Sequence, residues 1–485
     1  MIEAGIIFVI ILIASAGILA GRKVQGSSDF LTGGGRASTA LTTGALIGTI
    51  LGSQCTLGTA QLAFNFGISA WWFTVGSGLG CLFLGLFYAL PLRKSGCTTQ
   101  FQIISKNYGA LTEKAGAILC TTGTFVSILA QVIACVGFIP VLYPSINPFT
   151  ASILTVILMC LYIVMGGTWA AGMGGIVKTT LLYVSCIACL ILVIAKSGGI
   201  VETFSSAENF LLNSEIGRLS KILSHEDFIN RYLNLTARGV YKDLGSCVSL
   251  ILGILSTQSY MQYILSSKGD KEAKSAMIWG ALLVPPIGIA GIFIGLFMRA
   301  NYLTQSEVNA LISLGLEVPN LPVIASTIQV FPAFIINHVS PIFAGIMLGT
   351  LLITTVSGSS GLLLGVSAIA VEDILPVKSH KLFFSRLTII ITLIIAVTIA
   401  NIIPVQAIND LGFLSMTLRA SVVFMPLTCA LWFRGKISPR FILASIILSP
   451  TVAIIGALMK IPVEPLFTGF SVSILLCVLG FWFKR

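Results

Sequence analysis

The sequence GALIGTILGSQCTLGTAQLAFNFG, residues 44–67, decides the fold of this chain. It lies in a region without charged residues, Ala37–Leu92. That region is long enough for two membrane crossings, because one helix spans a bilayer core with roughly 20 residues. A lipid-facing helix would be mostly Leu, Ile, Val and Phe, whereas glycines, hydroxyls and glutamines interrupt this one. Backbone that leaves a helix at membrane depth must face protein or a water-filled cavity, so the interruption predicts the binding site of a membrane transporter.

The composition places the whole chain in a membrane. Charged residues make up 9% of it and hydrophobic residues 56%, with a mean hydropathy of +1.00, whereas an ordinary soluble chain is about 25% charged. The net charge of +11 does not indicate a nucleic-acid partner, because the basic residues lie in short loops beside the apolar segments. All cysteines except Cys97 fall in apolar runs and are expected to act as small hydrophobes, with a dithiol or metal site at Cys186 and Cys189 as the less favoured alternative.

Thirteen hydrophobic segments are predicted. Glu3 precedes the first of them and Arg22 and Lys23 follow it, a polarity that favours a retained helix over a cleaved signal peptide. An odd number of crossings puts the two ends on opposite sides. Most of the 28 Lys and Arg residues then share the side of the C-terminus, so we expect a plasma (inner) membrane protein with its N-terminus outside and its C-terminus in the cytoplasm. The predicted segments are residues 3–21, 39–64, 70–92, 115–141, 149–167, 175–196, 245–266, 275–298, 341–370, 384–403, 410–433, 440–459 and 465–483.

Six stretches, in order along the chain, resemble the sodium/solute symporter family, which includes proline, pantothenate, sialic acid and sugar transporters. The resemblance runs from about residue 20 to the C-terminal end. The stretches are GGGR at 33–36, AFNFGISAWW at 63–72, MGGTWAA at 165–171, STQSYMQYILSSKGDKEAKSA at 256–276, VSGSSGLLLGVSAIAVED at 356–373 and LWFRGKISPRFILASII at 431–447.

The resemblance implies an all-α fold with two inverted five-helix repeats, the LeuT-like arrangement, with one helix before them and two after. The two long outer loops are expected to act as lids or as solvated connectors, and the sequence leaves both open. The implied units are residues 1–38, an outer helix and inner loop; 39–196, repeat one; 197–244, an outer loop; 245–433, repeat two, with an outer loop at 300–340; and 434–485, two C-terminal helices.

An alternating-access carrier needs a site near the bilayer midplane, where broken helices present free backbone groups. The expected substrate contacts are polar residues of the first, third, sixth and tenth core helices. Gln258 and Gln262 are four residues apart and therefore share one helix face. The alternative is that these polar side chains only hydrogen-bond neighbouring helices to each other. The candidate substrate-binding residues are Gln54, Cys55, Thr56, Gln131, Gln258, Gln262, Ser415 and Arg419.

The resemblance also implies a sodium site between the first and eighth core helices. In the family, two backbone carbonyls of the broken helix and one carbonyl plus two hydroxyls of the eighth helix hold the ion. These positions fall on Gly48, Leu51, Thr354, Ser357 and Gly358. A hard cation prefers oxygen ligands, and one expected hydroxyl is missing at Gly358; a neighbouring hydroxyl could replace it only after a local shift.

The fifth core helix departs further from the family pattern. Where the family has Thr-Asp followed by Gln, this chain has Gly174, Gly175 and Lys178. An ammonium group can stand in for a bound monovalent cation. One hypothesis therefore places Lys178 in the vacated cation position, as the coupling residue, and makes transport independent of Na⁺. The alternative is a lysine near the membrane boundary that snorkels to water.

Arg419 lies about ten residues into a predicted span, near 15 Å deep at 1.5 Å per residue. A mid-membrane arginine costs roughly 3 kcal/mol or more unless it faces a cavity or a partner, and the acid of the same span, Asp410, lies at its outer end. Because guanidinium pairs bidentately with carboxylate, Arg419 predicts a carboxylate-bearing substrate. The alternatives are bonds to helix-end carbonyls or a closure contact with an acid of an outer loop.

The leading hypothesis is a secondary active transporter that imports a small polar solute, with Na⁺ as the coupling ion that the resemblance implies and no other cofactor. The first alternative is a Na⁺-independent carrier, proton-coupled or facilitative, and an alternative of another class is a membrane sensor of solutes. An enzyme is not expected, because His225, His338 and His380 lie in loops outside the predicted spans. The expected partners are the solute and the lipid bilayer; the sequence names neither the solute nor the oligomeric state.

Overall fold

The first core helix is broken where the sequence predicts it. The computed structural model describes residues 1–143, 145–164, 166–375, 377–402, 408–459 and 464–484. Helix α3 (Thr39–Ile50) starts at Ser38, whose side chain accepts a hydrogen bond from the Leu41 N–H. It ends before a non-helical segment, residues 51–56, and α4 (Leu57–Phe66) follows. The break is buried, so its free backbone groups face protein rather than lipid.

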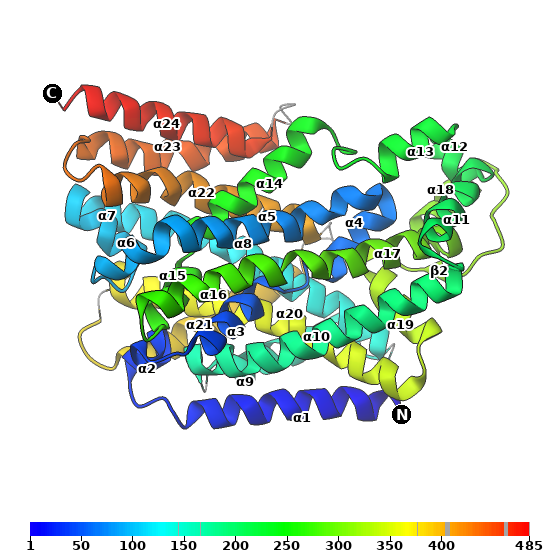
Figure 1. The fold of residues 1–485 in the computed structure, drawn as a ribbon, viewed down its shortest axis with the longest axis horizontal. Coiled ribbons are helices and arrows are strands. Elements are labelled where there is room, and N and C mark those ends of the chain that lie inside the picture. Colours follow the sequence, from blue (N-terminus) through cyan, green and yellow to red (C-terminus); the bar gives the residue numbers. More distant parts are fainter. Residues whose placement is uncertain (144, 165, 376, 403–407, 460–463, 485) are drawn as a thin grey trace.

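The helices form a bundle in which most axes follow one direction (Figure 1). Helix α1 (Ile2–Gly21) lies along one edge, and α23 (Pro439–Leu458) and α24 (Pro465–Trp482) lie along the opposite edge. Between them lie the helices of the two implied repeats: α5 (Trp72–Phe83) continued by η3 (Leu84–Tyr88) and α6 (Ala89–Lys94), α8 (Ala110–Leu142), α9 (Pro148–Ile163), α10 (Gly167–Ser197), α14 (Val240–Leu255), α15 (Gln258–Ser266), α16 (Asp270–Leu283), α17 (Pro285–Asn301), α20 (Pro341–Ile369) with η5 (Ala370–Ile374), α21 (Lys381–Ala400) and α22 (Ile408–Trp432).

Fewer helices of the described part meet the length of a membrane span than the sequence has hydrophobic segments. Ten helices of the described part are long and apolar enough to span a membrane, or eleven if α14 and α15, which meet at 48°, form one broken span. Two shorter apolar helices, α3 and α9, fall below that length. Each of the thirteen predicted segments coincides with helix, but the count of thirteen crossings stays a prediction.

The extramembrane segments gather at the two ends of the bundle (Figure 1). The N-terminus shares one end with the segments from both predicted outer loops, and the C-terminal end of α24 shares the other with the short helices of the predicted inner loops. The first group comprises α11 (Ile200–Leu212), α12 (Glu215–Leu219), α13 (His225–Tyr232), α18 (Gln305–Ser313), η4 (Thr327–Gln329), α19 (Val330–His338) and the parallel pair β1 (Leu303–Thr304) and β2 (Val323–Ile324); the second comprises α2 (Ser27–Thr32), η1 (Gly33–Gly35) and α7 (Gln100–Tyr108).

The outer segments are folded rather than open loops. A capping box starts α13, in which the Ser224 hydroxyl and the Asp227 carboxylate each bond the other's backbone. The hydrogen bond from Ser224 lowers the pKa of Asp227, because it favours the charged carboxylate. Thr304 and Glu307 form the same motif at α18. These caps fix the N-terminal ends of short helices within segments that the sequence predicts only as long outer loops.

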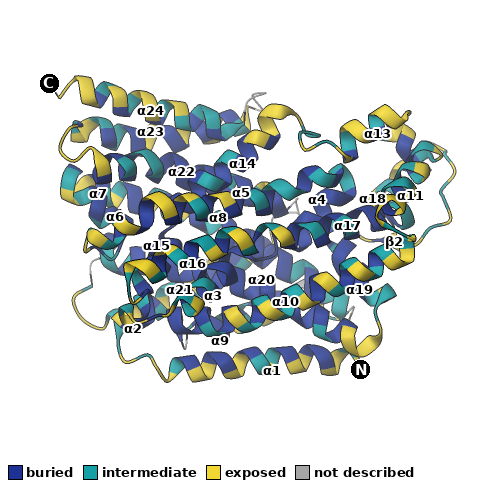
Figure 2. Cartoon of the chain, viewed as in Figure 1, coloured by how far each residue is buried: buried dark blue, intermediate teal, exposed yellow. Residues whose placement is uncertain are grey.

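Burial separates the centre of the bundle from its lipid-facing rim (Figure 2). Helix α20 is 83% buried and α22 78% buried in their most apolar windows, whereas α21 is only 22% buried and α24 28% buried. Ser357 and Arg419 lie on these two buried helices; Lys178 lies on α10, which is 33% buried in its most apolar window, but its own side chain is fully buried.

Glycines bring α3 and α10 into close contact. A Cβ atom on Gly175 would lie 2.0 Å from the Gly44 carbonyl oxygen, and one on Gly48 would lie 2.9 Å from the Gly175 Cα. Small residues at a helix interface allow this approach of two backbones. Because of this contact, the next turn of α10, which contains Lys178, lies beside the C-terminal end of α3.

The start of repeat one is bonded to the first helix of repeat two. The Ala37 N–H donates to the Ser266 carbonyl (2.8 Å), and the Lys268 N–H donates to the Ala37 carbonyl (2.9 Å). The Arg93 guanidinium adds bonds to the carbonyls of Ile264 (3.0 Å) and Ser267 (2.8 Å). We call this set of bonds the α3–α15 staple.

Candidate functional site

Lys178 occupies the expected cation position. Its ammonium nitrogen donates to the Gly48 carbonyl at 2.5 Å, the Leu51 carbonyl at 2.7 Å and the Ser357 hydroxyl at 2.6 Å. The side chain is fully buried, so the snorkelling alternative is wrong. An ammonium has three donors, and all three meet oxygens of the set that the family resemblance assigns to sodium.

Gly358 and Thr354 are the other two residues of that set, and the packing around Gly358 explains why one hydroxyl ligand is missing. A Cβ atom on Gly358 would lie 2.8 Å from the Gly52 Cα and 3.0 Å from the Gln131 Nε2. A serine there would collide with the backbone of the break, so the missing hydroxyl follows from the close packing of α20 against it. The Thr354 hydroxyl is buried and has no hydrogen-bond partner among the described residues.

Gln54 and Gln131 meet at the break. Gln131 Oε1 accepts from the Ser53 N–H (2.9 Å) and the Ser53 hydroxyl (2.6 Å), and its Nε2 donates to Gln54 Oε1 (3.4 Å). Gln54 Nε2 donates to the Ser127 hydroxyl (3.3 Å). All four side chains are at most 3% exposed. The structure thus brings Gln54 and Gln131 together from the first and third core helices, while a contact of either residue with substrate stays a prediction.

The Arg419 side chain, on α22, reaches α8 one helical turn away from Ser127 of this amide cluster. Its guanidinium donates to Thr257 Oγ1 (2.7 Å) and Ser415 Oγ (3.0 Å), and the Ser415 hydroxyl donates to the Gly123 carbonyl (2.5 Å). Gly123, Ser127 and Gln131 are four residues apart and therefore line one face of α8. The two sites share this face.

The guanidinium has no carboxylate partner within the described residues. Its further bonds go to the Ser415 carbonyl (3.2 Å) and to Met416 Sδ (3.2 Å). Arg419 is fully buried. Of the alternatives for this residue, the closure contact with an outer-loop acid is absent from the described part, and the bond to a backbone carbonyl is formed within its own helix.

The remaining candidates have local roles or no partner. Cys55 donates to the Ile50 carbonyl (3.2 Å) and Thr56 to the Gly52 carbonyl (3.2 Å), so both stabilise the break itself. Gln258 does not share the amide cluster: its carboxamide is bonded at both ends to the backbone of Gln100 and Thr98 (3.0 Å each) before α7. Both amide atoms of Gln262 are buried without a partner in the described part of the chain.

Sequence reasoning missed Ser53, Ser127 and Thr257. Each is a small polar residue in an apolar segment, a common pattern that does not distinguish a site from helix packing. Ser127 carried one usable signal, its spacing of four residues from both Gly123 and Gln131 on α8.

A polar cavity of about 240 Å³ lies along α4, from Gly58 beside the break to Phe66 at the other end of the helix. Asn409, at the start of α22, forms part of its wall; its side chain is 2% exposed, and both amide atoms have no partner within the described ranges. Gly412, one turn further along α22, packs on Gln54, where an added Cβ atom would lie 2.8 Å from Nε2. Helix α22 therefore contributes Asn409 to the cavity wall and, one turn on, contacts the amide cluster at Gly412. Its lining residues are Gly58, Gln61, Leu62, Asn65, Phe66, Arg238, Lys242, Thr327, Asn409 and Asp410.

A family model for the sodium:solute symporter family matches residues 30–433, which include the break, Lys178 and Arg419. The chain belongs to the sodium:solute symporter family. This is the family that the six stretches of sequence resemble, and it places the chain among multi-pass membrane proteins that carry out secondary active transport of solutes, which points away from an enzyme.

Two relatives in sequence are themselves described as transporters. The chain is 22% identical over 479 residues to high-affinity choline transporter 1 of Drosophila melanogaster, an alignment that covers 93% of this chain and 72% of the relative. It is 24% identical over 282 residues to the uncharacterized symporter YwcA of Bacillus subtilis, covering 57% of this chain and 52% of that protein.

Solved structures share the fold. A Na⁺-coupled sialic acid symporter, in a substrate-bound outward-open state, superposes with a TM-score of 0.77 at 16% identity, over 99% of this chain and 97% of the symporter. The nucleobase-cation-symport-1 transporter MHP1, in a closed conformation, gives 0.53 at 11% identity over 94% and 95% of the two chains. The predicted fold class, an all-α LeuT-like membrane bundle, is confirmed.

Proposed function

We propose that this protein is a secondary active transporter of a small carboxylate-bearing solute in which the ammonium group of Lys178 replaces the coupling sodium ion. Transport would then not require Na⁺. The observation that carries the proposal is the position of the Lys178 nitrogen, 2.5–2.7 Å from two carbonyl oxygens beside the helix break and from the Ser357 hydroxyl.

A sodium ion does not fit beside this ammonium group. Two like charges sharing the same three oxygens would repel each other in a buried site, where charges are weakly screened. The set also lacks the hydroxyl that a serine at position 358 would supply, and Gly52 leaves no room for one. Both features favour the Na⁺-independent hypothesis over the sodium symport that the family resemblance implies.

Arg419 supports a carboxylate in the solute. It is a fully buried cation with neutral acceptors only, among them a thioether sulfur, which is a weak acceptor. A carboxylate would offer two charged acceptors to the planar guanidinium, and such bidentate pairs are about twice as strong as neutral bonds. The Drosophila relative is named for choline, a cation; a cationic solute would leave the charge of Arg419 unbalanced.

The first experiment measures thermal unfolding of the purified protein in NaCl and in KCl at equal ionic strength. A ligand that binds the folded state stabilises it, by about 2.7 kcal/mol at a concentration of 100 Kd. We expect the same midpoint in both salts. Lys178→Ala, which vacates the position, and Lys178→Met, which keeps it filled, separate a sodium effect at this site from a general salt effect. A Na⁺-specific rise in the midpoint of the unmodified protein would refute the proposal.

The second experiment identifies the solute. A thermal-shift screen of small carboxylates, amino acids and choline, each with Na⁺ or K⁺, should yield carboxylates whose stabilisation does not depend on the cation. Uptake of a stabilising compound into proteoliposomes, with K⁺ replacing Na⁺ on both sides, then tests transport; imposing a proton gradient distinguishes a proton-coupled carrier from a facilitative one. Stabilisation by choline alone would contradict the role assigned to Arg419.

A further inference from the structure

A buried carboxyl group, that of Asp373 in η5, lies at the predicted inner end of the bundle. The residue is 2% exposed. Its Oδ1 atom accepts a hydrogen bond from the hydroxyl of Thr99, just before α7, at 2.6 Å. Its Oδ2 atom is buried, and no donor among the described residues reaches it. A buried carboxylate is unfavourable unless it is paired and fully hydrogen-bonded, so this group needs a positive charge or a proton.

No described basic residue supplies the positive charge. The elements around η5 include α8 and α21. On α21, Lys381 bonds both oxygens of Glu372 at 2.8 Å, and Arg386 lies over an aromatic ring of α2. Lys106 of α7 and Lys114 of α8 are exposed. The groups that act electrostatically on the Asp373 carboxyl are two acids and a thiol: Glu113, Glu372 and Cys120.

The contact between Asp373 and Glu113 needs a proton. Their carboxyl groups lie within hydrogen-bonding range of each other. Two ionised carboxylates contain acceptors only and repel each other, so the two acids form a bond only when one of them is protonated. Glu113 is half-buried in the first turn of α8, which gives the pair contact with the solution at this end of the bundle. The protonated pair still leaves Asp373 Oδ1 as the acceptor for Thr99.

The segment before α7 connects this acid pair to the second break, between α14 and α15. The Thr98 carbonyl accepts from the Gln258 carboxamide, and the Gln100 N–H donates to that carboxamide (3.0 Å each). The Gln100 side chain donates to the Ser256 carbonyl (3.1 Å), beside the residue that accepts from Arg419. Residues 98–100 are therefore bonded on one side to the acid pair and on the other to α15.

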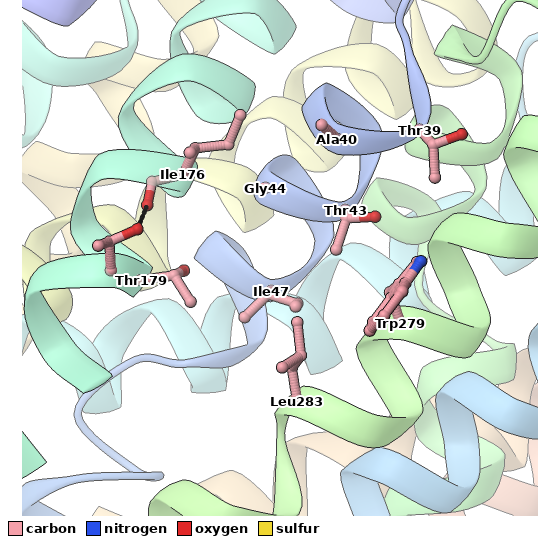
Figure 3. A pocket seen from close by; sticks show the side chains of 10 residues that line it. Thr39, Ala40, Thr43, Gly44, Ile47, Ile176, Thr179, Trp279 and Leu283 are labelled. Atoms are coloured by element: carbon pink, nitrogen blue, oxygen red, sulfur yellow. Dashed lines mark hydrogen bonds between the residues drawn. The ribbon is translucent and has the colours of Figure 1, made fainter. Parts of the chain in front are cut away.

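Helix α3 has room to move together with α15. The α3–α15 staple bonds the two helices to each other. A cavity of about 410 Å³ lies beside α3, between α3, α10 and α16, with Thr39 and Thr43 of α3 and Trp279 of α16 in its wall (Figure 3). Protein does not fill that side of α3, so a shift of this part of the helix displaces fewer packed side chains.

We propose that the Asp373–Glu113 pair holds one proton while the predicted inner end is closed, and that loss of this proton releases residues 98–100 and opens that end. Opening exposes both acids to water, both ionise, and the proton leaves into the solution on that side. On closing, a proton returns from the same solution, so the pair carries no proton across the membrane. It makes opening depend on the pH at this end, whichever solute is transported and whatever the role of Lys178.

The test uses Cys97, a native thiol that is 6% exposed and lies two residues before Thr99. Release of the segment should expose it, so its rate of alkylation by N-ethylmaleimide, followed by peptide mass spectrometry of the purified protein in detergent, measures opening. Asp373→Asn keeps an acceptor for Thr99 and gives Glu113 a donor, which mimics the protonated pair. Dividing the rate in the unmodified protein by the rate in this variant at the same pH removes the pH dependence of the thiol itself.

We expect this ratio to rise at least about tenfold between about pH 6 and pH 9, because opening releases one proton and a higher pH therefore favours the open state. Glu113→Gln should behave like Asp373→Asn, since the remaining acid no longer faces a like charge. If one of these two variants does not fold, the other serves as the reference.

The matched control is Glu372→Gln, which changes the adjacent acid that is paired with Lys381 and should keep the pH dependence of the unmodified protein. A ratio that stays constant with pH in the unmodified protein, a pH dependence that survives in Glu113→Gln, or its loss in Glu372→Gln would each overturn the proposal.

Discussion

Lys178 and Arg419 occupy corresponding places in the two implied repeats, and their surroundings differ. Each lies on the fifth helix of its repeat and contacts the broken first helix: Lys178 bonds the carbonyls of Gly48 and Leu51, and Arg419 bonds Thr257, between α14 and α15. The ammonium has three oxygen acceptors for its three donors. The guanidinium, with five donors, makes four bonds to described residues, one of them to sulfur.

The hydrogen-bond acceptors of Lys178 are a fixed part of the fold, whereas those of Arg419 can be exchanged for others. The Lys178 site has its full set of oxygen acceptors without any ligand, so its charge is held in place by the fold. The Arg419 site has a buried charge with weak neutral acceptors, so a carboxylate can replace them at a net gain in hydrogen bonding. Under the proposed function, the first repeat would serve coupling and the second would recognise the solute.

Removing the first cation should have the largest effect. Lys178→Met fills the same space without donors and leaves the carbonyls of Gly48 and Leu51 without the ammonium donor, while the Ser357 hydroxyl keeps its bond to the Thr354 carbonyl (3.2 Å). We expect a loss of about 2–6 kcal/mol in the free energy of unfolding, because each of the two buried carbonyls left without a donor costs about 1–3 kcal/mol, and loss of transport. Chemical denaturation in detergent measures the first quantity. Lys196→Met, an exposed position on the same helix, is the control and should change little; equal stability of Lys178→Met and Lys196→Met would mean that the ammonium does not hold the break.

Changing the second cation should affect binding more than folding. Arg419→Lys keeps the charge but loses the planar fork that donates to both oxygens of a carboxylate. We expect the affinity for a stabilising carboxylate to fall by about 10- to 100-fold, or roughly 1.4–2.8 kcal/mol, as measured by calorimetry. The exposed Arg22, changed to Lys, serves as control. An unchanged affinity in a folded Arg419→Lys protein would remove this residue from the solute site.

Gly358→Ser restores the hydroxyl that is missing from the expected cation site and tests whether packing against Gly52 explains its absence. In Gly358→Ser the new Cβ atom meets the Gly52 Cα at 2.8 Å, and we expect overpacking to lower the free energy of unfolding by about 2 kcal/mol. Gly26→Ser, where no atom lies within 4 Å of an added Cβ, should be tolerated. If the serine is accommodated and the protein gains a Na⁺-specific stabilisation, the packing explanation fails.

The smallest effect is expected at the second break. Thr257→Val removes one acceptor of Arg419 and should cost about 1–2 kcal/mol in the free energy of unfolding, the range for a single hydrogen bond to a charged group. Thr122→Val removes an exposed hydroxyl that bonds only its own helix and provides the baseline. A Thr257→Val protein as stable as that baseline would show that the guanidinium does not depend on the break.

The sequence offered the Lys178 site as one of two hypotheses, because its parts lie close together in the chain or recur in the family. Gly48 and Leu51 precede a break that glycine and polar residues make visible, and Lys178 stands where the family has other residues. The packing of Gly358 against Gly52 could not be predicted, because it depends on how closely α20 approaches the break. The partners of Arg419 were missed for the same reason: Thr257 and Arg419 are far apart in sequence, and hydroxyls are common in membrane helices.

Breaks also explain why the crossings are hard to count. An apolar run gives the right segment, but a helix interrupted at residues 51–56, or bent between α14 and α15, divides one crossing into two short elements. The outer segments were predicted less well still. Their helices are fixed by capping boxes at Ser224 and Thr304 and by the pairing of β1 with β2. The hydropathy of the sequence does not predict such contacts. Whether these segments act as lids stays a prediction.

The α3–α15 staple gives the two breaks a mechanical relation. Because the backbone of Ala37 is bonded on both sides to residues 266 and 268, a tilt of α3 must displace α15 with it, and Arg93 fastens the same joint to α6. Helices α3 and α15, which belong to the two implied repeats, are therefore bonded to each other at one end. If solute binding at one cation moved its helix, we expect these bonds to transmit the displacement to the helix beside the other cation, without any ion moving between the two sites.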